Sequence, residues 1–172
     1  YTLWHTLSLH DALPISLAGS RPRRDASVAR RRWKAGMSDG IEAAEGGLRV
    51  RWIPGEAFNR FDFEGTASDE AIEGCLRAVW RHPAYRYDRH ELYDFSATQA
   101  ERVSADGMRA LGSLNASEFE GAPDYRSAIV VPEAVLFGYS RVFRAYTGER
   151  GDNVGVFADR EAAVAWLLGG ER

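Results

Sequence analysis

The residue types that could supply a nucleophile and a base are Cys75, His82 and His90. A cysteine nucleophile needs a basic side chain near its thiol, because the thiolate is the reactive form. His82 follows Cys75 by two helical turns, and His90 lies beyond a further loop. Neither histidine belongs to a metal-ligand spacing such as His-x-x-x-His. We therefore predict that Cys75 is a small packed residue, that the protein is not an enzyme, and that it holds no metal or cofactor.

Two further polar side chains, Asp94 and Ser96, stand near the end of a predicted strand. Open α/β sheets bind ligands at the carboxyl ends of their strands, so both residues are candidate strand-end site residues. The alternative is that they only cap a loop.

Composition and charge exclude several function classes. The chain has 172 residues, of which 45% are hydrophobic and 27% charged, and this is the composition of one globular domain. A single cysteine excludes a disulfide framework, and no apolar run approaches the roughly 20 residues of a membrane span. No glycine-rich stretch has a nucleotide-binding pattern. We expect a soluble, cytoplasmic, bacterial protein that does not bind nucleic acid.

The N-terminal 36 residues differ in charge from the rest of the chain. Residues 1–36 contain seven Lys or Arg and two Asp, a balance of +5, whereas residues 37–172 have a balance of −8. The basic part has no apolar periodicity, which predicts disorder. The alternative is a basic arm that binds phosphates. Residues 5–15 resemble the translation of a sequencing adapter, so we interpret residues 1–36 as an artefactual extension and residues 37–172 as the domain.

From Met37 onwards, strand and helix patterns alternate. Residues 48–53 and 59–65 alternate with period two around Pro54-Gly55, which predicts a hairpin. The remaining strands are predicted at 90–96, 127–131 and 154–157, with helices that begin near Ser68, Ser104, Pro132 and Asp159. The predicted order is ββαβαβαβα. Strands that alternate with helices favour a mostly parallel, five-stranded mixed sheet in an α/β fold.

The helix after Pro132 has two contrasting faces in the sequence. At about 100° per residue, Val135, Tyr139, Val142 and Tyr146 fall on one line, flanked by Leu136 and Phe143, which predicts that these residues pack on the sheet. An outward aromatic side chain beside two arginines has the composition of a small interface, where both residue types are enriched. The opposite face therefore provides the candidate interaction-surface residues, which are Phe137, Arg141 and Arg144.

The same region carries a family likeness. Ile129–Tyr146 reads IVVPEAVLFGYSRVFRAY, and Val154–Leu167 reads VGVFADREAAVAWL. The ordered patterns V-x-P, F-G-x-x-R, V-x-V-F-x-D and A-x-x-W-L resemble the C-terminal half of the SpoIIAA-like proteins, which are relatives of the STAS domain. The likeness extends over about residues 48–168 and is strongest from Ile129 onwards. It implies a small α/β domain that binds partners or small ligands and does not turn over a substrate.

The resemblance also implies a regulatory site. In antagonist STAS domains, a serine of an Asp-Ser-Ser-Gly motif at the start of the second helix is phosphorylated. The corresponding position here is Ser104, which is the regulatory phosphorylation candidate. The surrounding residues, Arg102-Val-Ser-Ala-Asp106, lack the Asp-Ser and the Gly of that motif. The alternative is that Ser104 is only a helix N-cap, a structural role that explains it fully.

We therefore predict a non-catalytic regulatory or protein-interaction module, which binds a protein partner or forms a homodimer. The alternative is a carrier of a small apolar ligand or lipid, held between the sheet and the helices. A cavity of some hundreds of Å³ behind the third helix would favour the carrier, and a filled core with an apolar outer patch would favour a protein partner.

Overall fold

The computed structural model describes residues 40–55, 57–120 and 125–169 of the chain. Strands and helices alternate along most of this region. In chain order they are β1 (Ile41–Glu45), β2 (Leu48–Ile53), β3 (Phe58–Ser68), α1 (Asp69–Trp80), β4 (His90–Arg102), α2 (Ala105–Glu118), β5 (Ser127–Val130), α3 (Ala134–Ala145), the 3-10 segment η1 (Gly148–Asn153), β6 (Val154–Phe157) and α4 (Arg160–Leu167). The predicted disorder of residues 1–36 concerns residues outside the described ranges.

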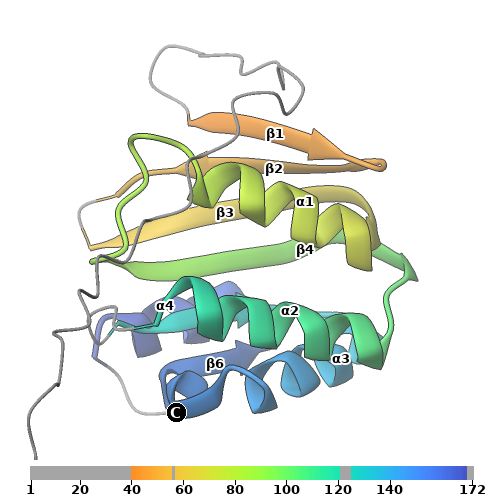
Figure 1. Cartoon of the computed structure of the whole chain (residues 1–172). Coiled ribbons are helices and arrows are strands. Elements are labelled where there is room, and N and C mark those ends of the chain that lie inside the picture. The colour runs from red at the N-terminus through yellow and green to blue at the C-terminus, as the bar shows by residue number, and fades with distance from the viewer. Residues whose placement is uncertain (1–39, 56, 121–124, 170–172) are drawn as a thin grey trace, which may run out of the picture. The chain divides into compact units, whose positions relative to one another are not determined.

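The strands form one sheet in the order β1-β2-β3-β4-β5-β6 (Figure 1). The pairs β1–β2 and β2–β3 are antiparallel, and the other three pairs are parallel. The predicted hairpin of residues 48–53 with residues 59–65 is confirmed as the β2–β3 pair. The predicted mixed, mostly parallel sheet is therefore confirmed.

The prediction of five strands is wrong, because β1 is a sixth strand. It pairs with β2 through a tight turn in which Gly46 and Gly47 both have positive φ, at 53° and 92°. Two glycines in this conformation are typical of a two-residue hairpin turn. The sequence of β1, IEAAE, offers one large apolar side chain, so its strand pattern is too weak to detect. The observed order is βββαβαβαβα.

Three predicted helix starts are confirmed by side-chain caps. The Ser68 hydroxyl accepts a hydrogen bond from the Ala71 N–H at 3.2 Å, and the Ser104 hydroxyl accepts one from the Gly107 N–H at 3.0 Å. The Asp159 carboxylate accepts one from the Ala162 N–H at 2.8 Å. Each cap satisfies a backbone donor that the first helical turn leaves without an intrahelical partner.

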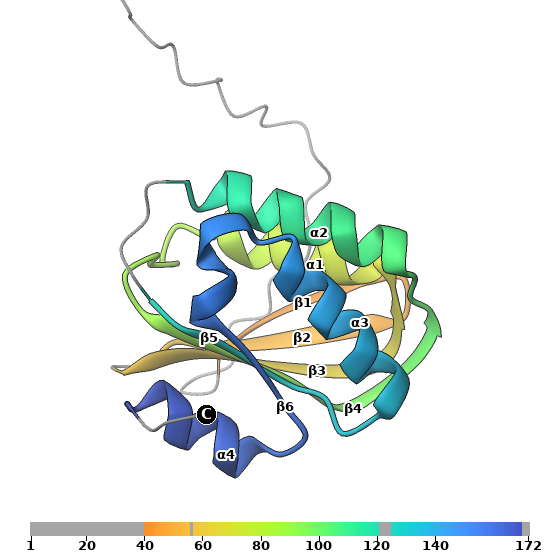
Figure 2. The same ribbon diagram turned by 90° about the horizontal axis from the view of Figure 1, so that it is seen from below.

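The two faces of the sheet are covered to different extents. Helices α1, α2 and α3 enclose the larger core cluster on one face, and α4 packs on the other face; Figure 2 shows α1 and α2 on the side of the sheet opposite to α4. Under α4, Trp166 and Leu167 pack with the central strand residues Leu92, Ala128 and Val130. The same face of β2 and β3 carries exposed charged residues such as Arg49 and Glu64. The central parallel strands β4 and β5 are thus covered on both faces by helices, whereas β3 is covered on one face.

The helices show no membrane-spanning segment. Among the residues that the structure describes, no helix has the length and apolar character that crossing a membrane requires.

Candidate interaction site at helix α3

Helix α3 follows the buried strand β5 through Pro132, and Glu133 occupies its N-cap position. The predicted inner side of this helix is confirmed in part, because Leu136 is buried and Tyr139, Val142 and Phe143 pack against the core. Leu136 and Ser140 are its buried residues, whereas Val135 and Tyr146, which we predicted to face the sheet, are 56% and 45% exposed. The buried line continues to Thr147, which bonds the Arg144 carbonyl through its hydroxyl at 2.7 Å. Ser140 and Thr147 on this buried line are polar, so a pattern of apolar residues alone does not identify the line in the sequence.

The contact with α2 fixes this orientation. Gly112 of α2 is buried against the C-terminal turn of α3, and a methyl group at position 112 would lie 2.6 Å from the Phe143 carbonyl oxygen. The absent side chain lets the two helices approach closely. Gly138 of α3, by contrast, is exposed, and a methyl group there would meet no atom within 4 Å.

The three predicted surface residues of α3 differ in their environment. Arg141 is exposed, as predicted, but Phe137 is half-buried. The Arg144 guanidinium is held against η1, where its Nε donates to the Gly151 carbonyl at 2.9 Å and a terminal nitrogen lies 4.0 Å from Asp152. Of the three residues, only Arg141 presents its side chain openly to solvent.

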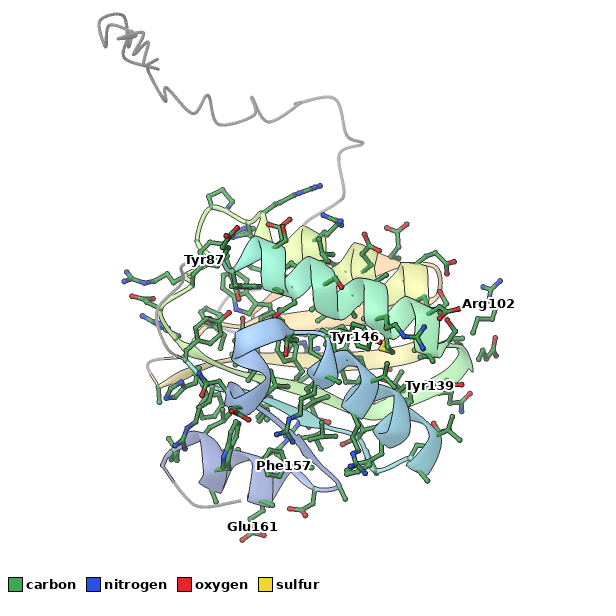
Figure 3. All side chains as sticks on the ribbon, turned by 60° about the horizontal axis from the view of Figure 1, so that its bottom comes forward. Tyr87, Arg102, Tyr139, Tyr146, Phe157 and Glu161 are labelled. Carbon is green, nitrogen blue, oxygen red and sulfur yellow. The ribbon has the colours of Figure 1, made fainter. Side chains whose placement is uncertain are left out.

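The solvent side of α3 is nevertheless apolar. We define the outer face of α3 as the exposed residues of the helix together with its C-cap, which are Ala134, Val135, Gly138, Arg141, Ala145 and Tyr146. Arg141 is the only charged residue among them. The exposed N-cap residue Glu133 borders this face. Tyr146 lies at the junction of α3 with α2 (Figure 3). The Arg109 guanidinium stands 5.6 Å from the Tyr146 ring centroid. Among the described residues, four large hydrophobic side chains are exposed, and two of them, Val135 and Tyr146, belong to this face.

A small apolar cavity lies behind the same helix. Its volume is about 50 Å³, and α1, β4, α2, β5 and α3 all contribute to its wall. None of the described residues that line it is charged. They are Ile72, Leu76, Trp80, Tyr93, Phe95, Met108, Leu111, Asn115, Ile129, Val131, Leu136, Tyr139, Ser140 and Phe143.

Ser104, the phosphorylation candidate, is a bonded N-cap. Its hydroxyl lies 2.6 Å from an Asp69 carboxylate oxygen and its N–H donates to the other at 3.1 Å, so the first residue of α1 also caps α2. Gly107 leaves room for this carboxylate, because any side chain at that position would overlap it. A phosphate on Ser104 would meet the negative charge of Asp69 at this position, and like charges at this distance repel.

The prediction that Asp94 and Ser96 lie at a strand end is wrong, because β4 continues to Arg102 and both residues lie within it. They form part of an ion-pair cluster that joins α4 to the sheet. The buried Asp94 carboxylate accepts the Ser96 N–H at 2.8 Å and the Arg160 Nε–H at 2.6 Å. Arg160 also reaches Asp62 of the neighbouring strand at 3.3 Å. Burial raises the pKa of Asp94, but the hydrogen bonds from Ser96 and the guanidinium of Arg160 outweigh it, so the pKa lies below its ordinary value. This cluster explains Asp94 as a structural anchor.

Another buried carboxylate in β4, Glu91, lies among hydroxyl groups. It is 1% exposed and accepts hydrogen bonds from the Tyr85 hydroxyl and, at 3.0 Å, from the Ser127 hydroxyl. Burial and the neighbouring Glu91 charge raise the pKa of Tyr85 far above its ordinary value. In the sequence, the one visible effect of Glu91 is that its charge makes the β4 segment less apolar than a central strand is expected to be. The serine and tyrosine that satisfy it come from other elements, so no local pattern indicates the cluster.

Cys75 and the two histidines have separate structural contacts. Cys75 is buried, and its Sγ lies 3.8 Å from the Leu48 carbonyl oxygen. His82 accepts the Ala84 N–H through Nδ1 at 3.2 Å and packs edge-on against Trp52. His90 accepts the Arg126 N–H through Nδ1 at 2.9 Å, which links the starts of β4 and β5. Within the described ranges, no three His, Cys, Asp or Glu side chains are grouped to hold a metal ion.

The His90 contact predicts a specific pH dependence. Burial, together with nearby Arg126, lowers the pKa of His90 below 6.5. As the pH falls through 6.5, the unfolded chain therefore binds a proton before the folded chain does, and stability is lost. In His90→Asn, the amide oxygen takes the place of Nδ1 but does not titrate. We expect wild type to lose more stability than His90→Asn between pH 7.5 and 5.5 in urea unfolding. An equal loss in the two proteins would contradict this assignment.

Comparisons with known proteins concern the fold. No family model matches the chain, and no match was found among curated proteins. Among solved structures, the chain is similar to an uncharacterized protein from the DUF3478 family with a SpoIIAA-like fold, from Shewanella loihica PV-4. The sequence identity is 19%, the match covers 77% of this chain and 99% of that protein, and the TM-score is 0.45. A SpoIIAA-like fold is also what the sequence motifs predict.

Proposed function

We propose that this chain is a non-catalytic protein-interaction module that binds a partner through the outer face of α3. The observation that carries the proposal is the apolar character of that face, on which Val135 and Tyr146 are exposed and Arg141 is the only charged residue. Exposed apolar groups that gather on one surface are typical of interaction sites, and aromatic residues and arginine are enriched in interfaces. By contrast, α1 carries Asp69, Glu70, Glu73 and Arg77, as expected of a solvated helix.

The charge of α3 favours a different protein over a second copy as the partner. The helix contains two arginines, Arg141 and Arg144, and no acidic residue. A homodimer through the outer face would offer Arg141 no carboxylate from that face, because Glu133 lies at the N-cap and Arg144 is held against η1. A partner with apolar side chains opposite Val135 and a carboxylate opposite Arg141 would complement this surface.

The carrier alternative has less support. Sites for small molecules enclose roughly 300–1,000 Å³, whereas the cavity behind α3 measures about 50 Å³. The combination of a nearly filled core and an apolar outer face is the one that we expect for a protein-binding module.

Affinity capture from a bacterial lysate tests this proposal with Val135→Glu as the disruptive variant. The matched control is Leu168→Glu, because Leu168 is also apolar and exposed, at 63%, but follows α4. We expect the full-length wild type and Leu168→Glu to retain the same protein, and Val135→Glu to lose it. Both variants should keep the wild-type melting temperature, because neither side chain is buried. Capture of the same proteins by all three chains, or of none by wild type, would contradict the proposal.

A further inference from the structure

We propose that an extended acidic segment of the partner protein adds a strand to the sheet at the open edge of β6, beside α3. This inference rests on the proposed function, because Arg141 of the outer face of α3 borders that edge. It states in addition which form the partner takes and which backbone groups bind it. Addition of an extended peptide to an exposed sheet edge is a general mode of protein recognition.

Strand β6 has one free edge. It is the last strand of the sheet, and β5 is the only described strand that pairs with it. The Val131 N–H donates to the Phe157 carbonyl at 2.9 Å, so the backbone groups of Phe157 point to the β5 side. Successive residues of a strand direct these groups to opposite edges, so the N–H and carbonyl of Val156 point to the free edge. The Val154 N–H, which points the same way, bonds the Gly151 carbonyl.

The two edge strands of the sheet differ in how they oppose pairing with another chain. Native edge strands are commonly protected by charged side chains or by proline. Strand β1, at the other edge, carries Glu42 and Glu45, whereas β6 reads Val-Gly-Val-Phe and has neither a charge nor a proline. Val156 and Phe157 are only half-buried. Strand β6 is therefore the edge at which the side chains leave pairing unopposed.

Helices α3 and α4 cover opposite faces of the sheet at β6 (Figure 2). On the α4 side, the centroid of the Phe157 ring lies 5.5 Å from that of the Trp166 ring. The Phe157 ring also lies over Gly155, where any side chain would overlap it. This side of the edge is therefore apolar.

The α3 side of the edge is positively charged. Arg144 bonds the Gly151 carbonyl of η1, the segment that leads directly into β6. Arg141 and half-buried Phe137 lie on the same side of α3 as Arg144, because residues three, four and seven positions apart share a helix face. Among the described residues, Arg141 has no carboxylate partner, and Glu133 at the N-cap lies about two helical turns away. A carboxylate from another chain would complement this side.

The two sides of the edge select the side chains of the added strand. Successive side chains of a strand point to opposite faces of the sheet. One set would therefore meet Phe157 on the α4 side, and the other would meet Arg141 on the α3 side. The segment that fits has apolar residues at alternate positions and acidic residues between them. Its main-chain hydrogen bonds supply affinity, and its alternating side chains supply specificity.

Peptide titration of the full chain tests this site. The probe is a short blocked peptide in which valine alternates with glutamate, and the comparison peptide has lysine in place of glutamate. In nitrogen-15 spectra, we expect the glutamate peptide to cause saturable shifts at Gly155, Val156 and Phe157. We expect the Val156 amide hydrogen to exchange about tenfold more slowly in the complex, because the peptide accepts a hydrogen bond from it.

Two results of this titration would overturn the inference. The absence of saturable shifts at β6, or shifts that leave the Val156 amide unprotected, would overturn strand addition. Equal affinity for the lysine peptide would overturn the acidic class of segment.

Val156→Pro removes the outward N–H and keeps the bonds to β5, because an edge strand tolerates proline where its nitrogen faces solvent. Ala44→Pro is the matched control at the other edge of the sheet. Glu45 and Leu48 close the two-residue turn between β1 and β2, so the Ala44 N–H also points away from the sheet. We expect Val156→Pro to lose peptide binding and Ala44→Pro to retain it. Peptide binding by a folded Val156→Pro protein would overturn the site.

Arg141→Glu keeps the test decisive if Val156→Pro does not fold, because the Arg141 side chain is exposed. We expect this variant to bind the glutamate peptide about tenfold more weakly than wild type and the lysine peptide more tightly, since charges at an interface set the choice of partner. An unchanged preference between the two peptides would overturn the placement of the acidic residues beside α3.

Capture from a bacterial lysate separates this inference from the proposed function. Loss of the captured protein in both Val135→Glu and Val156→Pro, together with the peptide result, supports strand addition. Loss in Val135→Glu with retention by a folded Val156→Pro protein overturns strand addition and leaves the proposed function intact. Failure of wild type to retain any protein contradicts the proposed function, whereas the peptide titration still decides whether β6 accepts a strand.

Discussion

Replacing Arg160 with alanine is expected to lower the free energy of unfolding by about 2–3 kcal/mol, because it removes the cation from a buried carboxylate. Arg160 bonds Asp94, which is buried, and reaches Asp62 on the adjacent strand. Asp62 and Asp94 are directly paired between β3 and β4, so without the guanidinium their charges repel each other. Urea unfolding of the full chain measures the loss.

The same variant has a predictable pH dependence. The pKa of Asp94 lies below its ordinary value in the folded protein, whereas an unfolded aspartate titrates near about 3.9. The ion pair therefore contributes its full free energy above the pKa of the unfolded aspartate. This contribution is lost as the pH falls through the pKa of Asp94 in the folded protein. The difference in the free energy of unfolding between wild type and Arg160→Ala should therefore become smaller as the solution is made acidic. A difference that stays constant down to pH 3 would contradict the ionic origin of the effect.

Arg77→Ala is the matched control for Arg160→Ala. Arg77 pairs with Glu73 one helical turn away at 2.7 Å and with Glu118 of α2 at 3.4 Å, and all three side chains are partly exposed. Exposed pairs of this kind contribute about 0.3–0.5 kcal/mol. Equal losses in the two variants would show that Asp94 is not a buried anchor.

Replacing Gly112 with alanine is expected to destabilise the protein by about 2 kcal/mol, because the added methyl group overpacks the contact between α2 and α3. The methyl group would lie 2.6 Å from the Phe143 carbonyl oxygen and 2.9 Å from the Tyr146 Cβ. Backbone atoms on the opposing side cannot rotate away, so the two helices must separate. The higher helix propensity of alanine, about 1 kcal/mol, offsets only part of this cost.

Gly138→Ala provides the control for this second prediction. Gly138 is also a helical glycine of the same helix pair, but its added methyl group would meet nothing within 4 Å. We expect Gly138→Ala to stabilise the protein by up to about 1 kcal/mol through helix propensity alone. Opposite signs for the two variants in urea unfolding support the orientation of α3, and a stabilising Gly112→Ala would contradict it.

The sequence predicts the elements of this fold better than their surfaces. Strands β2, β3 and β5 and the caps Ser68, Ser104 and Asp159 follow from local patterns, because period-two alternation and capping residues act over a few positions. Local patterns do not predict strand β1, because its stability comes from pairing with β2 and packing under α1, and not from its own side chains.

The orientation of α3 illustrates what local patterns cannot determine. The predicted inner side includes Leu136, which is buried, but its members Val135 and Tyr146 are exposed and polar Ser140 is buried instead. Gly112 of α2 allows a close contact at the C-terminal turn of the helix. That contact joins residues about thirty positions apart in the sequence. The prediction that Phe137 and Arg144 are exposed is wrong, because contacts with other elements set the orientation of the helix and leave both residues half-buried. The residues of the outer face of α3 are therefore identified only from the structure.

Photo-crosslinking from position 135 tests the central claim, that α3 binds a protein partner, most directly. A photoreactive phenylalanine analogue replaces Val135 in one full-length chain and Leu168 in another, since both side chains are exposed and apolar. After irradiation in bacterial cells, we expect position 135 to yield one discrete crosslinked protein of different sequence and position 168 to yield none. A crosslink from position 168 alone, or none from position 135, would contradict the assignment of α3 as the binding surface.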